Sequence, residues 1–175
     1  MQTLFQRLLG PSFSTLPSTV QALHAIRGRA VYAGRATISR GRNPVANLFA
    51  AIAGLPRTSL DVPTTVEFFA DETAETWSRN FGGAQMSSRL TADDGQLAER
   101  LGPMQFRFDV AVRDDAIHWR TAGVRLLDIL PLPTAWFAHV RCREREHAGR
   151  YEFLVEAALP LIGRVIRYEG WLEPA

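Results

Sequence analysis

The sequence predicts a mainly β protein, in which a curved antiparallel sheet or closed barrel carries short N-terminal helices and one helix after its first strand. Apolar and polar residues alternate along most of the chain, and turn residues separate the alternating segments. Helical patterns are confined to the N-terminus and one later segment. About ten strands with short connections do not stay one flat open sheet. We therefore expect a lipocalin- or calycin-like barrel.

The composition fits one folded domain. The chain has 175 residues, of which 46% are hydrophobic and 22% are charged, so it can bury a sizeable core and is not broadly disordered. We expect a single domain over residues 1–175. Its N-terminal helical segment would cover 1–26, and its antiparallel β barrel would cover 28–173.

Two short helices are predicted before the barrel. Residues 2–9 form an amphipathic pattern that Gly10 and the following proline interrupt. Ser18 and Gln21 have the spacing of a capping box, which predicts a second short helix. His24 lies near the end of that helix, where we interpret it as a helix-terminal or packed histidine.

The first strand and the helix after it have clear sequence signals. Residues 28–40 alternate as a strand. In the following segment, NPVANLFAAIAG, Asn43 suits the N-cap, Pro44 suits the first helical position, and Gly54 suits the C-terminal stop. This helix, 44–53, is apolar almost all round. Such a helix is either buried on both sides or covers a hydrophobic opening.

From Pro63 onward the chain is predicted to be almost entirely strand. The strands are expected at about 63–70, 74–81, 84–91, 96–101, 104–113, 116–126, 134–143, 149–159 and 164–172. Pro131 and Pro133 interrupt the sheet and favour an extended corner. The alternative is a helix-grip fold with a long C-terminal helix. The pattern of strand, turn and strand in the last thirty or so residues does not supply that helix.

Charge and cysteine usage exclude several function classes. All 20 basic residues are Arg, so no lysine can form a Schiff base. The net charge is only +2, and basic and acidic residues are interspersed along the chain, which argues against nucleic-acid binding. Cys142 is the one cysteine, so no intrachain disulfide forms, and it has the pattern of a small buried hydrophobe. The interrupted apolar pattern at the N-terminus and the short apolar runs elsewhere predict neither a secretory signal nor a membrane span, so we expect a cytoplasmic protein.

The sequence carries no catalytic, nucleotide-binding or metal signature. The histidines at positions 24, 118, 139 and 147 lack metal-ligand spacing, so no metal and no cofactor is expected. The candidates for acid–base chemistry are His118 and Glu75.

Arginine and aromatic residues recur together along the predicted strands. In the segment ETWSRNFGGAQMSSRL, alternation places Trp77, Arg79 and Phe81 on one face. If these faces turn inward, guanidinium groups line a polar end of a ligand cavity; if they turn outward, they form weak cross-strand ion pairs. The candidate ligand-binding residues are Trp77, Arg79, Arg120, Arg141, Arg167 and Trp171. The candidate apolar walls are Phe68, Met86, Phe106, Phe108, Tyr151 and Phe153.

Three functions are consistent with these patterns. The first is a barrel that binds a small lipid-like or acidic amphipathic ligand without catalysing a reaction. The second is an enzyme that uses His118 with a nearby carboxylate as acid or base. The third is an interaction domain that docks on a dehydrogenase-like partner through helix 44–53 or the N-terminal helix.

Four segments together carry a family resemblance: LLGPSFSTLPSTVQALH at the start, ETWSRNFGGAQMSSRL in the middle, LPLP before the last strands and IRYEGWL at the end. The chain resembles a bacterial family of uncharacterised proteins, domain of unknown function 4166, over essentially its whole length. The resemblance implies that the domain occurs alone or fused to a saccharopine-dehydrogenase-like module, and so implies a possible oxidoreductase partner. It supplies no catalytic residues.

Overall fold

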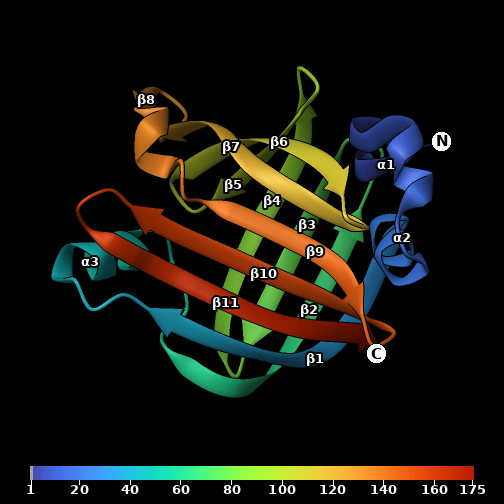
Figure 1. The fold of residues 1–175 in the computed structure, drawn as a ribbon, viewed down its shortest axis with the longest axis horizontal. Coiled ribbons are helices and arrows are strands. Elements are labelled where there is room, and N and C mark those ends of the chain that lie inside the picture. The colour runs from blue at the N-terminus through green and yellow to red at the C-terminus, as the bar shows by residue number, and fades with distance from the viewer. Residues whose placement is uncertain (1) are drawn as a thin grey trace.

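The computed structural model describes residues 2–175 and shows a closed antiparallel barrel with short helices at its ends (Figure 1). Around the barrel the strands follow in the order β1, β2, β3, β4, β5, β6, β7, β9, β10 and β11, and β11 pairs with β1 again. Pairing of β6 with β7 completes the closure. The strand β8 pairs with the last residues of β7, beyond the part of β7 that pairs with β9. The predicted fold class is confirmed.

The strands are β1 (Gly28–Arg40), β2 (Ser59–Ala70), β3 (Ala74–Phe81), β4 (Ala84–Asp93), β5 (Gln96–Leu101), β6 (Met104–Arg113), β7 (Ala116–Leu126), β8 (Leu130–Leu132), β9 (Arg141–His147), β10 (Arg150–Leu159) and β11 (Gly163–Pro174). The helices are α1 (Leu4–Leu9), α2 (Ser18–His24) and α3 (Pro44–Ile52), with 3-10 turns η1 (Gly10–Thr15) and η2 (Thr134–Phe137). The last two strands occupy the region where a helix-grip fold would need its long helix.

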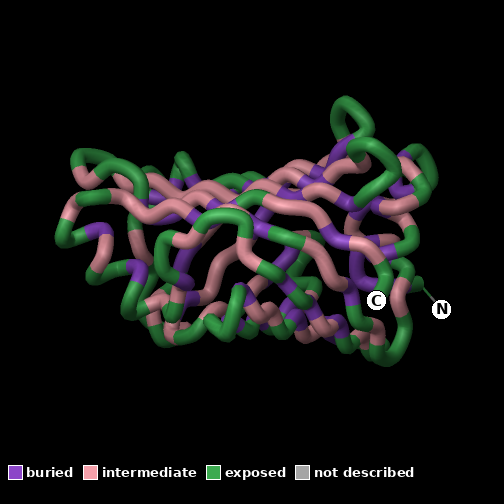
Figure 2. Tube along the Cα trace, turned by 90° about the horizontal axis from the view of Figure 1, so that it is seen from below, coloured by how far each residue is buried: buried purple, intermediate pink, exposed green. Residues whose placement is uncertain are grey.

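Alternation along each strand separates an interior from a solvated exterior. In Figure 2 the barrel is flattened into two layers, and buried positions recur along the strands. On β6, for example, Met104 and Phe108 are buried in the core, whereas Gln105 is only half-buried. Because strand side chains alternate between the two faces, the apolar set of each strand fills one continuous interior.

The N-terminal helices close one end of the barrel. The ring of Phe5 on α1 is fully buried, and its centroid lies 6.1 Å from that of Trp77 and 5.8 Å from that of Trp119. The Thr3 hydroxyl donates a hydrogen bond to the His24 carbonyl oxygen at 2.7 Å, which ties α1 to α2. The helices therefore act as a plug whose aromatic side chains extend the barrel core.

At the other end, α3 lies beside β11 and rests on it through small residues. The Asn43 side chain accepts a hydrogen bond from the Val45 backbone N–H at 2.9 Å, as expected for an N-cap. Ala46 and Ala50 are buried against Val165, while the larger side chains of the helix remain exposed. The helix was predicted to be buried on both sides or to cover an opening, and only its alanine stripe is buried.

The strand predicted over 134–143 is wrong over residues 134–140. Residues Thr134–Phe137 form η2, because Pro133 sets the entry to a helical turn and cannot donate to a strand ladder. The strand in this region, β9, starts only at Arg141 and continues to His147. The remaining predicted strands are present with small shifts in their ends, the largest at β2, which begins at Ser59.

Two glycines allow β1 and β11 to approach closely. A Cβ atom on Gly34 would lie 1.9 Å from the Trp171 carbonyl oxygen, and one on Gly170 would lie 2.2 Å from the Arg35 carbonyl oxygen. Real Cβ atoms do not approach backbone oxygens so closely. Glycine at these positions therefore permits the tight bend of the barrel wall.

Candidate functional site

A cavity of about 120 Å³ lies inside the barrel, between the plug helices and α3. Its walls are mainly aromatic and aliphatic side chains from strands on all sides. They include Phe68, Met86, Phe106, Phe108, Tyr151 and Phe153, all six of the residues predicted as apolar walls. The barrel thus contains a small, mostly apolar and partly open cavity.

Arg79 brings a cation into this cavity. Glu75, Trp77, Arg79 and Phe81 occupy alternate positions of β3, and all four turn toward the interior. The Arg79 side chain is 10% exposed, and its Nη1 donates to the Ser88 hydroxyl at 2.9 Å. Its guanidinium carbon lies 5.1 Å from the centre of the Trp77 ring, a cation–π distance.

Glu99 on β5 faces Arg79 across the cavity wall. The distance from Arg79 Nη2 to Glu99 Oε1 is 3.7 Å, which is an ion pair without a direct hydrogen bond. Among the described residues, Ser88 accepts the one side-chain hydrogen bond that Arg79 donates. A guanidinium has five N–H donors, so Arg79 retains donors that a bound molecule can use.

A second polar group lies between the cavity and the plug. His24 Nε2 is 2.6 Å from Glu144 Oε2, and the two side chains are 0% and 6% exposed. Burial and the nearby Glu144 charge raise the pKa of Tyr151, which also lines the cavity, well above its usual value. Glu144 lines the cavity, so this network forms its inner wall.

Glu75 lies at the plug end of β3 and is buried. Its Oε2 accepts a hydrogen bond from Trp77 Nε1 at 3.0 Å. Burial raises the pKa of Glu75 above its usual value, although nearby His24 and the Trp77 hydrogen bond oppose the shift. Of the two acid–base candidates, Glu75 is therefore inside the barrel.

His118 lies on the outside. It follows Ile117 and precedes Trp119, both of which are buried in the core, and its own position on β7 is half-buried. In the sheet it is opposite Arg143 of β9, an outward position. A site built on His118 would be on the outer surface, separated from the cavity by the barrel wall.

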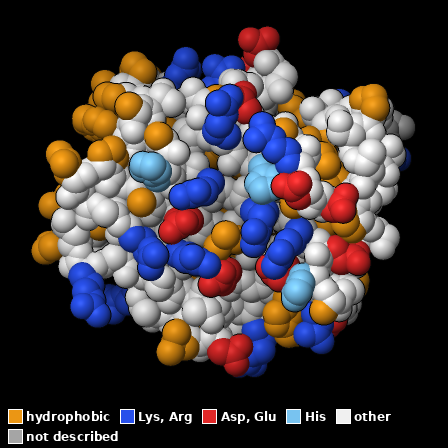
Figure 3. Space-filling view, viewed as in Figure 1, with side chains coloured by type: hydrophobic (Ala, Val, Ile, Leu, Met, Phe, Trp, Pro, Cys, Tyr) orange, Lys and Arg blue, Asp and Glu red, His pale blue; other side chains and the backbone are white. Residues whose placement is uncertain are grey.

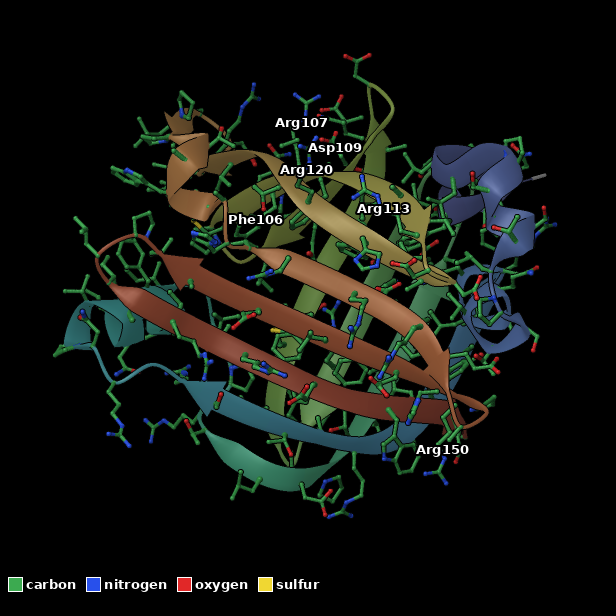
Figure 4. The ribbon with its side chains drawn as sticks, viewed as in Figure 1. Phe106, Arg107, Asp109, Arg113, Arg120 and Arg150 are labelled. Atoms are coloured by element: carbon green, nitrogen blue, oxygen red, sulfur yellow. The ribbon has the colours of Figure 1, made fainter. Side chains whose placement is uncertain are left out.

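The other predicted binding residues also lie on the outer face. Arg120 pairs with Asp109 at 2.8 Å, and Figure 4 shows the two on the outside of β6 and β7. Arg141 lies 3.8 Å from Glu156, and Arg167 lies 2.8 Å from Glu169. The Trp171 ring is covered by the Arg150 guanidinium at 4.1 Å.

The predicted Arg and aromatic set is therefore divided. Trp77 and Arg79 reach the cavity, whereas Arg120, Arg141, Arg167 and Trp171 form ion pairs or stacks outside. Outward pairs of this kind contribute little stability individually.

Sequence reasoning missed Glu99, Glu144 and the role of His24. Glu144 alternates with Cys142, which was predicted to be buried and is buried, so the inward position of Glu144 was available from the same pattern. It was missed because the strand was predicted to end at residue 143. Burial also raises the pKa of Cys142 well above its usual value, which keeps its thiol protonated and unreactive.

No metal cluster accompanies these groups. Within residues 2–175, no three His, Cys, Asp or Glu side chains gather in a way that would hold a metal ion. Likewise, no helix in this described part of the chain is long and apolar enough to cross a membrane.

The family model for a domain of unknown function (DUF4166) matches residues 16–172. The chain belongs to this family. The match starts just before α2 and runs into β11, so it includes His24, Arg79, Glu99 and Glu144 but not α1. A search of curated proteins found no significant match. The DUF4166 domain is thus, in this chain, a closed barrel with an internal polar cluster.

Proposed function

We propose that this barrel binds a small lipid-like molecule with a polar, uncharged head and catalyses no reaction on it. The observation that carries the proposal is the partly open, mostly apolar cavity that contains Arg79, whose guanidinium keeps unused donors beside Glu99. Apolar pockets with a few convergent polar groups are the usual form of small-molecule sites.

The charges of the cavity define the head group. Arg79 is one cation, and Glu99 and Glu144 are two carboxylates that line the same space. An anionic head would meet these carboxylates at close range, so the acidic ligand considered from the sequence is disfavoured. A hydroxyl or amide can instead accept a hydrogen bond from Arg79 and donate one to Glu99.

The volume defines the body of the ligand. An engineered apolar cavity of about 150 Å³ holds one benzene molecule. A cavity of about 120 Å³ therefore admits a small ring or a short stretch of alkyl chain. A longer ligand, such as a ten-carbon alcohol, would keep its head and part of its chain in the cavity and extend past Ala53 and Leu55, which line the cavity at the α3 end.

The internal acid–base groups support binding over catalysis. His24 and Glu144 are hydrogen bonded to each other, and Glu75 is bonded to Trp77, so these groups are already paired within the fold. The exposed side chains of α3 favour a docking surface as a second role. A dehydrogenase-like partner stays a prediction that rests on the family resemblance.

The test compares two probes that share a chain and differ in the head, decan-1-ol and decanoate, in titrations of Trp fluorescence above neutral pH. Trp77 and Trp119 line the cavity and report occupancy. Decanol should bind more tightly than decanoate. Arg79→Met should weaken decanol binding roughly tenfold or more, because it removes a charge-assisted hydrogen bond.

Arg120→Met is the matched control, since Arg120 is 81% exposed on the outer face and should not affect decanol binding. Thermal melting of both variants checks that they fold. Native mass spectrometry of the purified protein would show any molecule carried through purification. Equal decanol affinity of wild type and Arg79→Met would refute the proposed site, as would the absence of binding by either probe.

A further inference from the structure

Exposed large hydrophobic side chains gather at the end of the barrel opposite the plug helices. They come from α3, the turn between β7 and β8, η2 and the turn between β10 and β11. We call them the apolar rim, and its members are Val45, Leu48, Phe49, Ile52, Leu127, Ile129, Leu130, Trp136 and Leu161. Figure 3 shows hydrophobic side chains along the corresponding left edge of the molecule. Leu161 is fully exposed, and Ile129 is 81% exposed.

The segments of the rim adjoin one another. A Cβ on Gly102, in the turn between β5 and β6, would lie 3.8 Å from the carbonyl oxygens of Ile52 and Ala53. The next residue, Pro103, accepts a hydrogen bond from the Leu127 backbone N–H at 2.7 Å. The end of α3 is therefore linked through a single turn to the start of the β7–β8 connection.

On the other side of α3, segments of the rim also lie next to one another. Ile162, beside Leu161, packs with the cluster of Ala46, Ala50 and Val165 that holds α3 on β11. The Ala158 backbone N–H donates to the His139 carbonyl oxygen at 3.4 Å, which links the end of β10 to the segment after η2. The rim therefore borders one end of the barrel and is not a set of scattered residues.

This border surrounds the cavity end that lacks the plug. Ala53, Leu55 and Leu101 line the cavity, and they directly follow α3 or precede Gly102. A surface that contacts the rim would thus face the cavity.

The charge at this end is positive. Arg42 and Arg57 flank α3, Arg125 precedes the β7–β8 turn, and all three are exposed. Residues 41–60 contain no acidic side chain. Within the described chain, none of the three arginines has a carboxylate within ion-pair distance. Asp128, at the rim, is held by Arg100.

We propose that the apolar rim docks this barrel on the surface of a bilayer that contains anionic lipids. Exposed Leu, Ile and Phe side chains flanked by arginines, with a Trp beside them, have the chemistry of an element that lies shallowly in the headgroup boundary. The three exposed arginines match the negative surface of such a bilayer. A second protein surface would not call for this excess of unpaired positive charge around an apolar centre.

Docking on the bilayer does not require a ligand in the cavity. The transfer of a lipid-like molecule from the bilayer into the cavity would rest on the proposed function. The two ideas are tested separately, because docking uses Leu48 and Leu161 whereas the cavity uses Arg79.

The experiment is sedimentation of the full chain with vesicles of phosphatidylcholine, alone or mixed with phosphatidylglycerol, at low and high salt. The wild type should sediment with the mixed vesicles at low salt, and less at high salt. Leu48→Glu/Leu161→Glu should weaken vesicle binding roughly tenfold or more, because two exposed apolar anchors become anions. Arg42→Gln/Arg57→Gln should reduce the preference for the anionic vesicles.

Phe69→Glu is the matched control. Phe69 is 52% exposed on β2 next to the turn whose Glu72 carbonyl binds Arg7 of α1, so it lies at the plug end. This variant should sediment like the wild type, and Arg79→Met should do so as well. If Arg79→Met sediments with the vesicles but no longer binds decanol, both the docking proposal and the proposed cavity site are supported. Intact decanol binding without sedimentation overturns docking alone.

Two further results would overturn the docking proposal. One is equal vesicle binding by the wild type and Leu48→Glu/Leu161→Glu, with circular dichroism showing both folded. The other is a stable dimer in light scattering that the same double variant dissociates, which would assign the rim to a second copy of the chain.

Discussion

Replacing His24 by leucine should destabilise the protein by about 3–5 kcal/mol, the typical cost of leaving a buried carboxylate without its partner. His24 Nε2 lies 2.6 Å from Glu144 Oε2, and the two side chains are 0% and 6% exposed, so water cannot replace the lost partner. Leucine has nearly the volume of histidine. The contact with the Phe5 ring, now 3.9 Å between centroids, is therefore largely kept, and the cost arises from the unpaired Glu144 carboxylate.

The double variant His24→Leu/Glu144→Leu separates the polar effect from packing. Replacing both partners of a buried pair by apolar groups is often neutral or stabilising. Here two leucines must fit a site shaped for a histidine and a glutamate, so we expect a net cost of about 1–3 kcal/mol from imperfect packing. The double variant should thus be no less stable than His24→Leu alone, which gives a coupling energy of several kcal/mol.

The assay is equilibrium unfolding in urea, followed by Trp fluorescence and by far-UV circular dichroism. For a domain of this size, a loss of about 3–5 kcal/mol lowers Tm by roughly 6–20 °C. The reasoning would be refuted if His24→Leu cost less than about 1 kcal/mol, or if the costs of the two single variants simply added in the double variant.

Two further predictions concern the barrel itself. Burial raises the pKa of Glu75 above its usual 4.5, so the folded protein keeps a proton that the unfolded chain has released. The stability of the protein therefore falls as pH rises through the raised pKa. Glu75→Gln should flatten this pH dependence of stability in thermal melts recorded across pH. Gly170→Ala should lower the free energy of unfolding in urea by several kcal/mol, because its Cβ would lie 2.2 Å from a facing carbonyl oxygen. The control Gly123→Ala should be near neutral, because its Cβ would meet nothing nearer than 3.9 Å.

The fold could be predicted because each strand and each turn of an antiparallel barrel has its own local sequence pattern. In β6 and β10, apolar residues occupy every second position, since one face of each strand meets the core. The connections carry residues that tolerate positive φ, such as Gly82 and Gly95, which marked the ends of the strands. The error at η2 arose where Trp136 and Phe137 matched a strand composition, although Pro133 begins a helical turn there.

Which face of a strand turns inward was harder to predict. The sequence left both orientations open for the strand faces that combine arginine with aromatic residues. Arg79, which lies between Trp77 and Phe81 on β3, turns inward. Trp171 turns outward, where Arg150 on the neighbouring strand covers its ring. Alternation assigns residues to two sets, but only the partner strand shows which set is buried.

The pairing of His24 with Glu144 lay beyond any local pattern. The two residues are 120 positions apart, and the histidine belongs to a helix that reaches the barrel only through the plug. Closing such a contact depends on the whole topology. A helix-terminal or packed histidine was the most that the sequence could indicate at position 24.

The two ends of the barrel differ in how much buried structure a ligand of the proposed kind would disturb on entering. Opening the plug would expose Phe5 and break the His24–Glu144 pair, both of which are buried, so this route is costly. At the other end, α3 buries only Ala46 and Ala50, and its larger side chains already face outward. A small displacement of α3 therefore exposes little new apolar surface, and the bordering rim would cover that surface while docked. For the proposed ligand, entry past α3 would therefore be the route of lower free energy, and it would lead from the apolar rim to Arg79 without disturbing the plug.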